Sequence, residues 1–143
     1  MLSVEKIVNS LGGRAILGHR LLSGSDLVDL VHKGLPSASA SFVLKNGVLS
    51  KAEFYKLIAS DRTFARRLHE KKLSSTESDK LTRFIRVRAF AADVFGDEKE
   101  ADLWLREKNL LLNNNRPLDM LDTDSGSQLV ENILGRIAHG IPS

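Results

Sequence analysis

A short run of basic side chains between residues 61 and 72 carries the most distinctive chemistry in this sequence. If the run is helical, Phe64 and Leu68 point inward and basic side chains occupy the outward faces. Such a helix can neutralise phosphates and place arginine against guanine edges in the major groove of DNA. We therefore predict a DNA-binding surface made of Arg62, Thr63, Arg66, Arg67 and Lys71.

Two short helical patterns joined by a tight break would position this surface. The first pattern begins at Ser50, and the break falls at Ser60 and Asp61. Two short helices of which the second is basic are typical of a helix-turn-helix. The turn carries Ile58 or Ala59 where glycine is common, so a solvated basic helix without a DNA role stays the alternative interpretation.

Other residue combinations that could bind phosphate, metal or a substrate fail on spacing. Residues 13–20 have the two glycines of a phosphate loop, but His and Arg follow where Lys and Ser or Thr are needed. Residues 122–126 resemble the opening of a calcium loop, but the glycine is one position early and Ile133 replaces the final glutamate. The four histidines are scattered, and no nucleophile elbow or zinc-protease motif occurs. We predict no enzyme activity, no metal and no cofactor.

Length and composition exclude several further classes of protein. The chain has 143 residues and no cysteine, so a disulfide scaffold, a thiol nucleophile and a thiolate zinc site are ruled out. No apolar run approaches the roughly 18–20 residues that cross a bilayer, and the first residues lack a basic stretch followed by an apolar block. We expect a cytoplasmic protein with no membrane partner.

Charge is distributed unevenly along the chain. The formal net charge is +3, made up of +2 in residues 1–50, +5 in residues 51–96 and −4 in residues 97–143. A basic middle beside an acidic end indicates one surface for a polyanion and another for a different kind of partner. Unevenly charged helix faces without a partner are the alternative.

Helical periodicity and capping residues recur along the whole chain, and no segment has a convincing strand pattern. Serine with an acidic residue three positions later marks two helix starts, and glycine marks several helix ends. We predict an all-α fold with a connection at residues 36–41, although an Ala-rich segment of this kind can also be helical. The expected helices cover residues 4–11, 23–33, 50–58, 61–70, 74–95, 97–112 and 124–139.

These patterns divide the chain into three parts. Residues 1–40 would form an N-terminal helical region, residues 41–96 the helix-turn-helix region and residues 97–143 a C-terminal helical domain. The N-terminal region is a candidate for self-association, because two-fold DNA sites commonly require a dimer.

Seven motifs occur in an order that resembles one known family. They include Arg62-Thr-Phe-Ala-Arg-Arg-Leu68, the run Arg116-Pro-Leu-Asp-Met-Leu-Asp-Thr123 and the run Leu134-Gly-Arg-Ile-Ala-His-Gly140. The others are short runs at residues 11–18, 34–36, 73–79 and 94–96. Together they resemble the Xre/MbcA/ParS-type antitoxins of bacteria, the partners of RES-domain toxins.

The resemblance implies an Xre-like helix-turn-helix region and a C-terminal toxin-binding domain. The partner toxin resembles ADP-ribosyl transferases in fold and depletes NAD, and the antitoxin obstructs the NAD site with its C-terminal helix and tail. The complex represses its own operon. The toxin-facing candidates carried over from the family are Arg116, Pro117, Leu118, Leu121, Asp122, Leu134, Arg136, Ile137, His139, Gly140 and Ile141.

Several of these candidates have a structural alternative. Pro117 fits the first turn of a helix, Asp122 or Thr123 can cap the last helix, and Gly140 suits a left-handed helix end. Ile137 is a better candidate for contact, as are His139 and Ile141. Two other functions stay open: a stand-alone repressor whose C-terminal domain dimerises, and an adaptor that binds protein but never DNA.

Overall fold

The computed structural model describes residues 3–20 and 23–140, and within these ranges it contains helices and turns but no β-strand. The only extended pairing described there consists of isolated bridges between Pro36 and Lys72 and between Asn109 and Asn115. The predicted all-α fold is confirmed. In this described part of the chain, no helix is both long and apolar enough to span a membrane.

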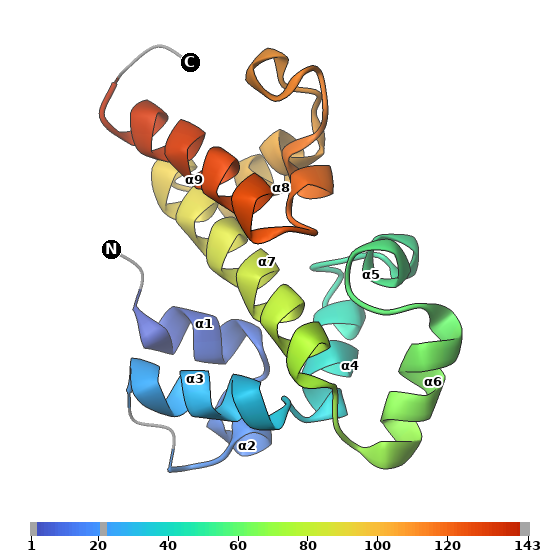
Figure 1. Ribbon diagram of the computed structural model, residues 1–143. Helices are drawn as coiled ribbons and strands as arrows, with labels where there is room; N and C mark the ends of the chain where they lie inside the picture. The colour runs from blue at the N-terminus through green and yellow to red at the C-terminus, as the bar shows by residue number, and fades with distance from the viewer. Residues whose placement is uncertain (1–2, 21–22, 141–143) are drawn as a thin grey trace. The chain divides into compact units, whose positions relative to one another are not determined.

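Residues Ser3–Thr82 form one compact unit. Figure 1 shows its helices in colours from blue to green, and α7 continues from it. The core of this unit includes Val8, Leu11, Leu35, Phe54 and Leu81, all of which are fully buried. Its elements are α1 (Val4–Ser10), α2 (Arg14–Leu17), α3 (Gly24–Lys33), α4 (Ser37–Lys45), α5 (Lys51–Leu57), α6 (Asp61–Glu70) and the first turns of α7 (Ser75–Phe95).

Local capping explains where several of these helices begin. The Ser23 hydroxyl accepts from the Asp26 N–H, and the Asp26 carboxylate accepts from the Ser23 N–H, so α3 starts with a capping box as predicted. Ser50 and Glu53 make the same reciprocal pair at the start of α5. Such pairs satisfy backbone N–H groups that have no partner within the helix.

The predicted connection at residues 36–41 is wrong, because Ser37–Lys45 forms α4. The small polar residues in this run are typical of a linker, but here they allow close packing. Ser37, Ser39 and Ala40 are buried, and Pro36 precedes the first turn of the helix. The Ser37 hydroxyl donates to the Arg67 carbonyl at 2.5 Å, which ties α4 to α6.

Residues Arg83–Ser143 form the second compact unit, which is described to residue 140. Figure 1 shows it in colours from yellow to red. Its core includes Phe84, Leu105, Leu121 and Leu134. After the later turns of α7 come α8 (Glu98–Arg106), the 3-10 helices η1 (Leu110–Leu112) and η2 (Pro117–Met120), and α9 (Asp124–Ala138).

Arginines on α7 connect that helix to the rest of the second unit. The Arg88 guanidinium makes two hydrogen bonds to Asp102 on α8, at 2.8 and 3.0 Å. Arg86 pairs with Glu131 on α9 at 2.8 Å. The division between the two compact units falls between Thr82 and Arg83, inside α7, so one continuous helix supplies residues to both.

Candidate functional site

The turn between α5 and α6 is built without glycine. Ile58 ends α5 with an ordinary right-handed backbone, and its N–H donates to the Phe54 carbonyl at 2.8 Å. The Ala59 N–H donates to the same carbonyl at 3.2 Å, and Ser60 caps α6. Because no residue of this turn needs a positive φ, the missing glycine does not argue against a helix-turn-helix.

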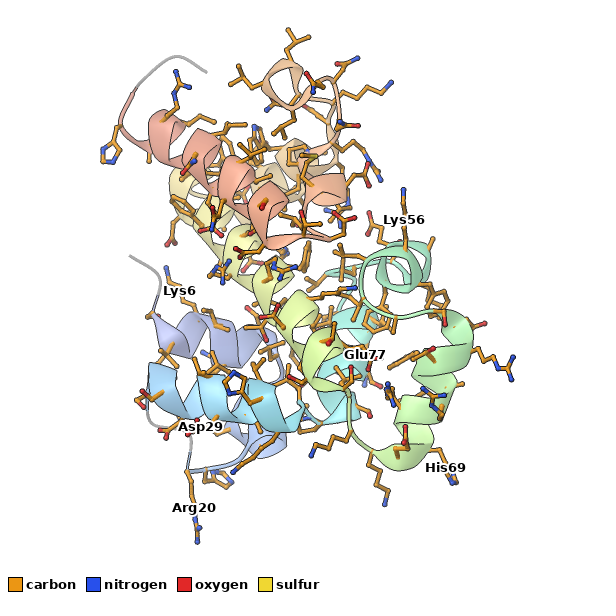
Figure 2. All side chains as sticks on the ribbon, viewed as in Figure 1. Lys6, Arg20, Asp29, Lys56, His69 and Glu77 are labelled. Carbon is orange, nitrogen blue, oxygen red and sulfur yellow. The ribbon has the colours of Figure 1, made fainter. Side chains whose placement is uncertain are left out.

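The exposed face of α6 is basic. Arg62 is exposed, and 62% of the Arg66 side chain is accessible, with only a long contact of 3.7 Å to Glu70. His69 lies seven residues after Arg62 on the same stripe and was not predicted; Figure 2 shows it directed away from the rest of the protein. Its helical spacing from Arg62 and Arg66 was the available signal.

The predicted inward-facing pair on α6 is half correct. Phe64 is buried and lies against Phe54, with ring centroids 4.8 Å apart. Leu68, in contrast, is 45% exposed, so its predicted inward position is wrong. The helix is rotated so that Arg67, rather than Leu68, lies against the rest of the unit.

The other predicted DNA-binding residues of α6 have structural roles. The Thr63 N–H donates to the capping hydroxyl of Ser60 at 3.2 Å, and Thr63 is half-buried. Lys71 is exposed at the end of α6 in a left-handed conformation with φ of 64°, and its N–H donates to the Arg67 carbonyl. The side chain of Arg67 is only 19% exposed and pairs with Glu70 and Glu77.

In the second unit, some predicted toxin-binding residues lie in the core. Leu121 and Leu134 are fully buried, and Leu118 is nearly so. Pro117 is buried at the first position of η2, which matches its structural alternative. These side chains shape the unit from inside, and their role as direct toxin contacts stays a prediction.

The segment before α9 contains further predicted toxin-binding residues, and some of them bond to residues nearby in the sequence. The Arg116 guanidinium makes two hydrogen bonds of 2.9 Å to the Asp119 carboxylate. The Thr123 hydroxyl caps α9 by accepting from the Gly126 N–H at 3.0 Å, whereas Asp122 is exposed and is not the cap.

The last turn of α9 presents the remaining candidates. Arg136 and His139 are exposed and Ile137 is half-buried. Within the part of the chain that the structure describes, Arg136 makes no ion pair. Gly140 has φ of 72°, the left-handed geometry expected after a helix end, and Ile141 lies outside the described residues.

A loop in the second unit exposes apolar residues that were not among the predicted contacts. Leu110 is 87% exposed, and Leu111 is also exposed. The loop is closed by the bridge between Asn109 and Asn115, and the Asn109 side chain accepts from the Leu111 N–H at 2.9 Å. The predicted helix over residues 97–112 is therefore too long, because α8 ends at Arg106 and Leu110–Leu112 form the separate turn η1. Three successive leucines, which one helix face cannot bury together, were the available signal.

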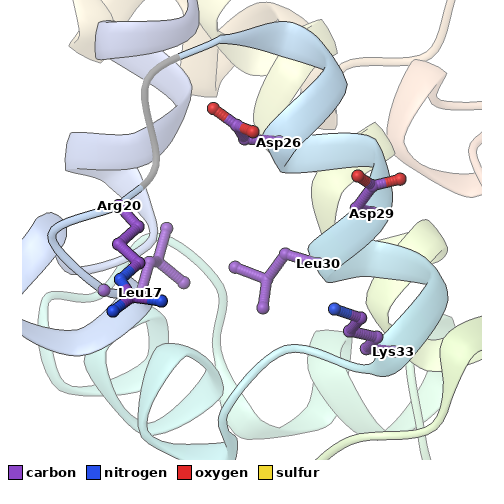
Figure 3. A pocket seen from close by; sticks show the side chains of 7 residues that line it. Leu17, Arg20, Asp26, Asp29, Leu30 and Lys33 are labelled. Atoms are coloured by element: carbon purple, nitrogen blue, oxygen red, sulfur yellow. The ribbon is translucent and has the colours of Figure 1, made fainter.

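An open cavity of about 220 Å³ lies between α2 and α3. Figure 3 shows Arg20 and Leu17 on one side of it and residues of α3, including Asp29 and Lys33, on the other. Its lining mixes both signs of charge, so it does not select an anion or a cation. No cluster of three metal-binding side chains occurs among the described residues.

Comparison with known proteins identifies both units. The chain matches the antitoxin Xre-like helix-turn-helix domain over residues 26–86 and the antitoxin Xre/MbcA/ParS C-terminal toxin-binding domain over residues 90–140. An antitoxin Xre from Photorhabdus laumondii is 34% identical over 124 residues, which cover 85% of this chain and 84% of the relative. Another from Yersinia enterocolitica is 30% identical over 117 residues, covering 81% and 72%. This chain therefore belongs to the Xre antitoxin family.

Proposed function

We propose that this chain is the antitoxin of a type II toxin–antitoxin pair, with separate surfaces for operator DNA and for the toxin. One observation carries the proposal. The same chain has a basic, exposed face on α6 and solvent-exposed side chains in the last turn of α9. The net charge of +5 in residues 51–96 and −4 in residues 97–143 supports two partners of different chemistry.

The DNA-binding part of the proposal rests on α6. Arg62, Arg66 and His69 lie on one exposed stripe, and two of them carry fixed positive charge. A helix with this face can enter the major groove with its N-terminal residues against base edges, while the preceding helix crosses the phosphate backbone. A two-fold operator would be bound by two copies of the chain.

The toxin-binding part rests on the last turn of α9. We propose that this turn and the residues after it obstruct the active site of a RES-domain toxin that degrades NAD. Arg136 and His139 are exposed there, and Ile137 is half-buried beside them. A guanidinium with no ion pair among the described residues is suited to an anionic or carbonyl-rich site.

The test of toxin binding is NAD consumption by the product of the gene adjacent to this one, with and without this chain. The full chain is expected to inhibit, and a version ending at Ala138 is expected to inhibit poorly, because it keeps α9 and loses the tail beyond that helix. Arg136→Ala should weaken inhibition, whereas Lys99→Ala, an equal change of charge on exposed α8, should not. Full inhibition by the shortened chain would contradict blockade by the tail.

The test of DNA binding is retention of a duplex from upstream of the gene. Arg66→Ala should weaken binding by about 1–3 kcal/mol if the side chain reads a base. Lys33→Ala, an exposed lysine on α3, is the matched control. No salt-dependent retention by the wild-type chain would exclude the DNA role. DNA binding with no inhibition of the toxin would favour the stand-alone repressor.

A further inference from the structure

The recognition helix α6 has a very small apolar anchor. Among its ten residues, only Phe64 is buried. A surface helix is normally held by a stripe of apolar side chains, which fixes both its position and its rotation. One buried side chain holds a helix close to its unit but controls its rotation weakly, so polar contacts must supply the rest.

Arg67 makes the strongest polar contacts of α6. Its Nε donates to Glu77 Oε1 at 2.8 Å and its Nη2 donates to Glu77 Oε2 at 3.1 Å. This two-pronged geometry fixes direction as well as distance. The third donor, Nη1, reaches Glu70 Oε1 at 3.0 Å. Only 10% of the Glu77 side chain is exposed, so water competes little for the pair.

Glu77 is itself held firmly at the start of α7. Its Oε1 accepts from the Ser74 N–H at 2.8 Å, while its own N–H donates to the Ser74 hydroxyl at 3.1 Å. Burial alone raises the pKa of the Glu77 carboxyl, but the hydrogen bonds from Arg67 and Ser74 lower it below its ordinary value. Figure 2 shows Glu77 between the start of α7 and α6.

The backbone of Arg67 is held as well as its side chain. Its carbonyl accepts from the Ser37 hydroxyl at 2.5 Å and from the Lys72 N–H at 3.2 Å. Arg67 is thus tied to α4 through its carbonyl and to α7 through its guanidinium. Two carboxylates already bind the Arg67 guanidinium, so its charge and its donors are engaged within the protein.

From these contacts we infer that Arg67 is a positioning residue: through Glu77 it sets the rotation of α6, so that Arg62, Arg66 and His69, rather than Arg67, face DNA. The inference rests on the DNA-binding part of the proposed function. It separates the two adjacent arginines of α6 by role. Arg66 is a contact, and Arg67 holds the helix that presents it.

The first test measures affinity for the upstream duplex at several salt concentrations. Arg67→Lys keeps the positive charge but loses the pair of guanidinium N–H donors that bind Glu77. It should weaken DNA binding about tenfold, and the dependence of log affinity on log salt concentration should keep the same slope. Glu77→Gln should also weaken binding, although it makes the chain more positive by one charge. Arg66→Ala is the comparison, because removing a cation that lies at the DNA should lower the salt slope by about 1, whichever group it contacts.

Two results of this test would overturn the inference. One is wild-type affinity in Arg67→Lys, because a phosphate contact survives exchange to lysine. The other is DNA binding by Glu77→Gln that is as tight as that of the wild type or tighter, which is what the added positive charge alone would produce. If Glu77→Gln does not fold, Glu77→Asp takes its place with the same expectation of weaker binding, because it keeps the charge and shortens the reach.

The second test needs no DNA. Amide hydrogen exchange in residues 65–70 of the free protein should be about tenfold faster in Glu77→Gln, because local opening of α6 becomes easier. The same amides should be unaffected in Arg66→Ala. Unchanged exchange in Glu77→Gln overturns the positioning role. Absence of DNA binding by the wild-type chain, with exchange as expected, overturns only the DNA part of the proposed function.

Discussion

The helices α6 and α9 carry the two proposed binding surfaces, and they are held in opposite ways. In α6, one of ten residues is buried and an ion pair fixes the orientation. In α9, the fifteen residues include five buried ones, Gly126, Ser127, Val130, Ile133 and Leu134. The first helix keeps most of its side chains exposed, while the second exposes one stripe along its length and its last turn.

This difference indicates how each surface can change without loss of the fold. Outward residues of α6 can be replaced freely, provided that Phe64 and Arg67 stay. Along α9 the buried residues fix one face of the helix, so variation in partner contacts is confined to the exposed stripe and the end. Substitutions in the two helices can therefore test this contrast.

The largest effect is expected from Leu134→Ala. Leu134 is fully buried, and the cavity left behind should lower the free energy of unfolding by about 2–5 kcal/mol. Leu68→Ala on α6 should change it by less than about 0.5 kcal/mol, because Leu68 is a surface residue and is already 45% exposed. Urea unfolding measures both, and similar losses would contradict the contrast.

Gly126→Ala should destabilise α9 at its start. An added Cβ would lie 2.0 Å from the Met120 carbonyl oxygen, which belongs to the backbone and cannot turn aside. The expected loss is about 1–3 kcal/mol, as for other overpacked sites. Thermal unfolding would detect it, and a Tm equal to that of the wild type would show that the turn before α9 can move away.

A pH series should distinguish the polar support of α6 from the apolar support of α9. The pKa of the Glu77 carboxyl is lowered in the folded chain. Its contribution to the free energy of unfolding is therefore fully present above its ordinary pKa of 4.5 and is lost as the pH falls through the pKa of the folded state. The stability difference between wild type and Glu77→Gln should therefore shrink below about pH 4.5. The difference for Leu134→Ala should stay constant, and equal pH dependence would contradict the comparison.

The smallest effect is a gain. Gly135 lies inside α9, and an added Cβ would meet nothing within 4 Å. Gly135→Ala should therefore raise the free energy of unfolding by about 0.5–1 kcal/mol. If this more stable variant inhibits the toxin less well, the loss reports a close approach of the toxin at this point and not a folding defect.

Local signals made much of the fold predictable. The capping box of Ser23 with Asp26 and that of Ser74 with Glu77 mark helix starts by themselves, and the positive φ of Gly34 and Gly96 follows from their positions at helix ends. These features depend on residues three or four positions apart, which sequence alone displays.

Features that depend on distant partners were not predictable in this way. Arg67 is placed by Glu77, ten residues later and on another helix, so helical spacing alone put it on an outward face. The run around Ser39 resembles a linker, and only burial in the folded unit makes it part of α4. In both cases tertiary packing overrides local propensity.

Because α7 belongs to both compact units, no loop separates the helix-turn-helix part of the chain from its C-terminal part. A hybrid with one relative's DNA-binding part and another's toxin-binding part must be joined within this helix. An α-helix turns by about 100° per residue, so a junction that gains or loses one residue near Thr82 would rotate every later residue of α7 by that angle about the helix axis. Only a junction that keeps the helical phase of α7 therefore leaves the later residues of this helix in register with the earlier ones.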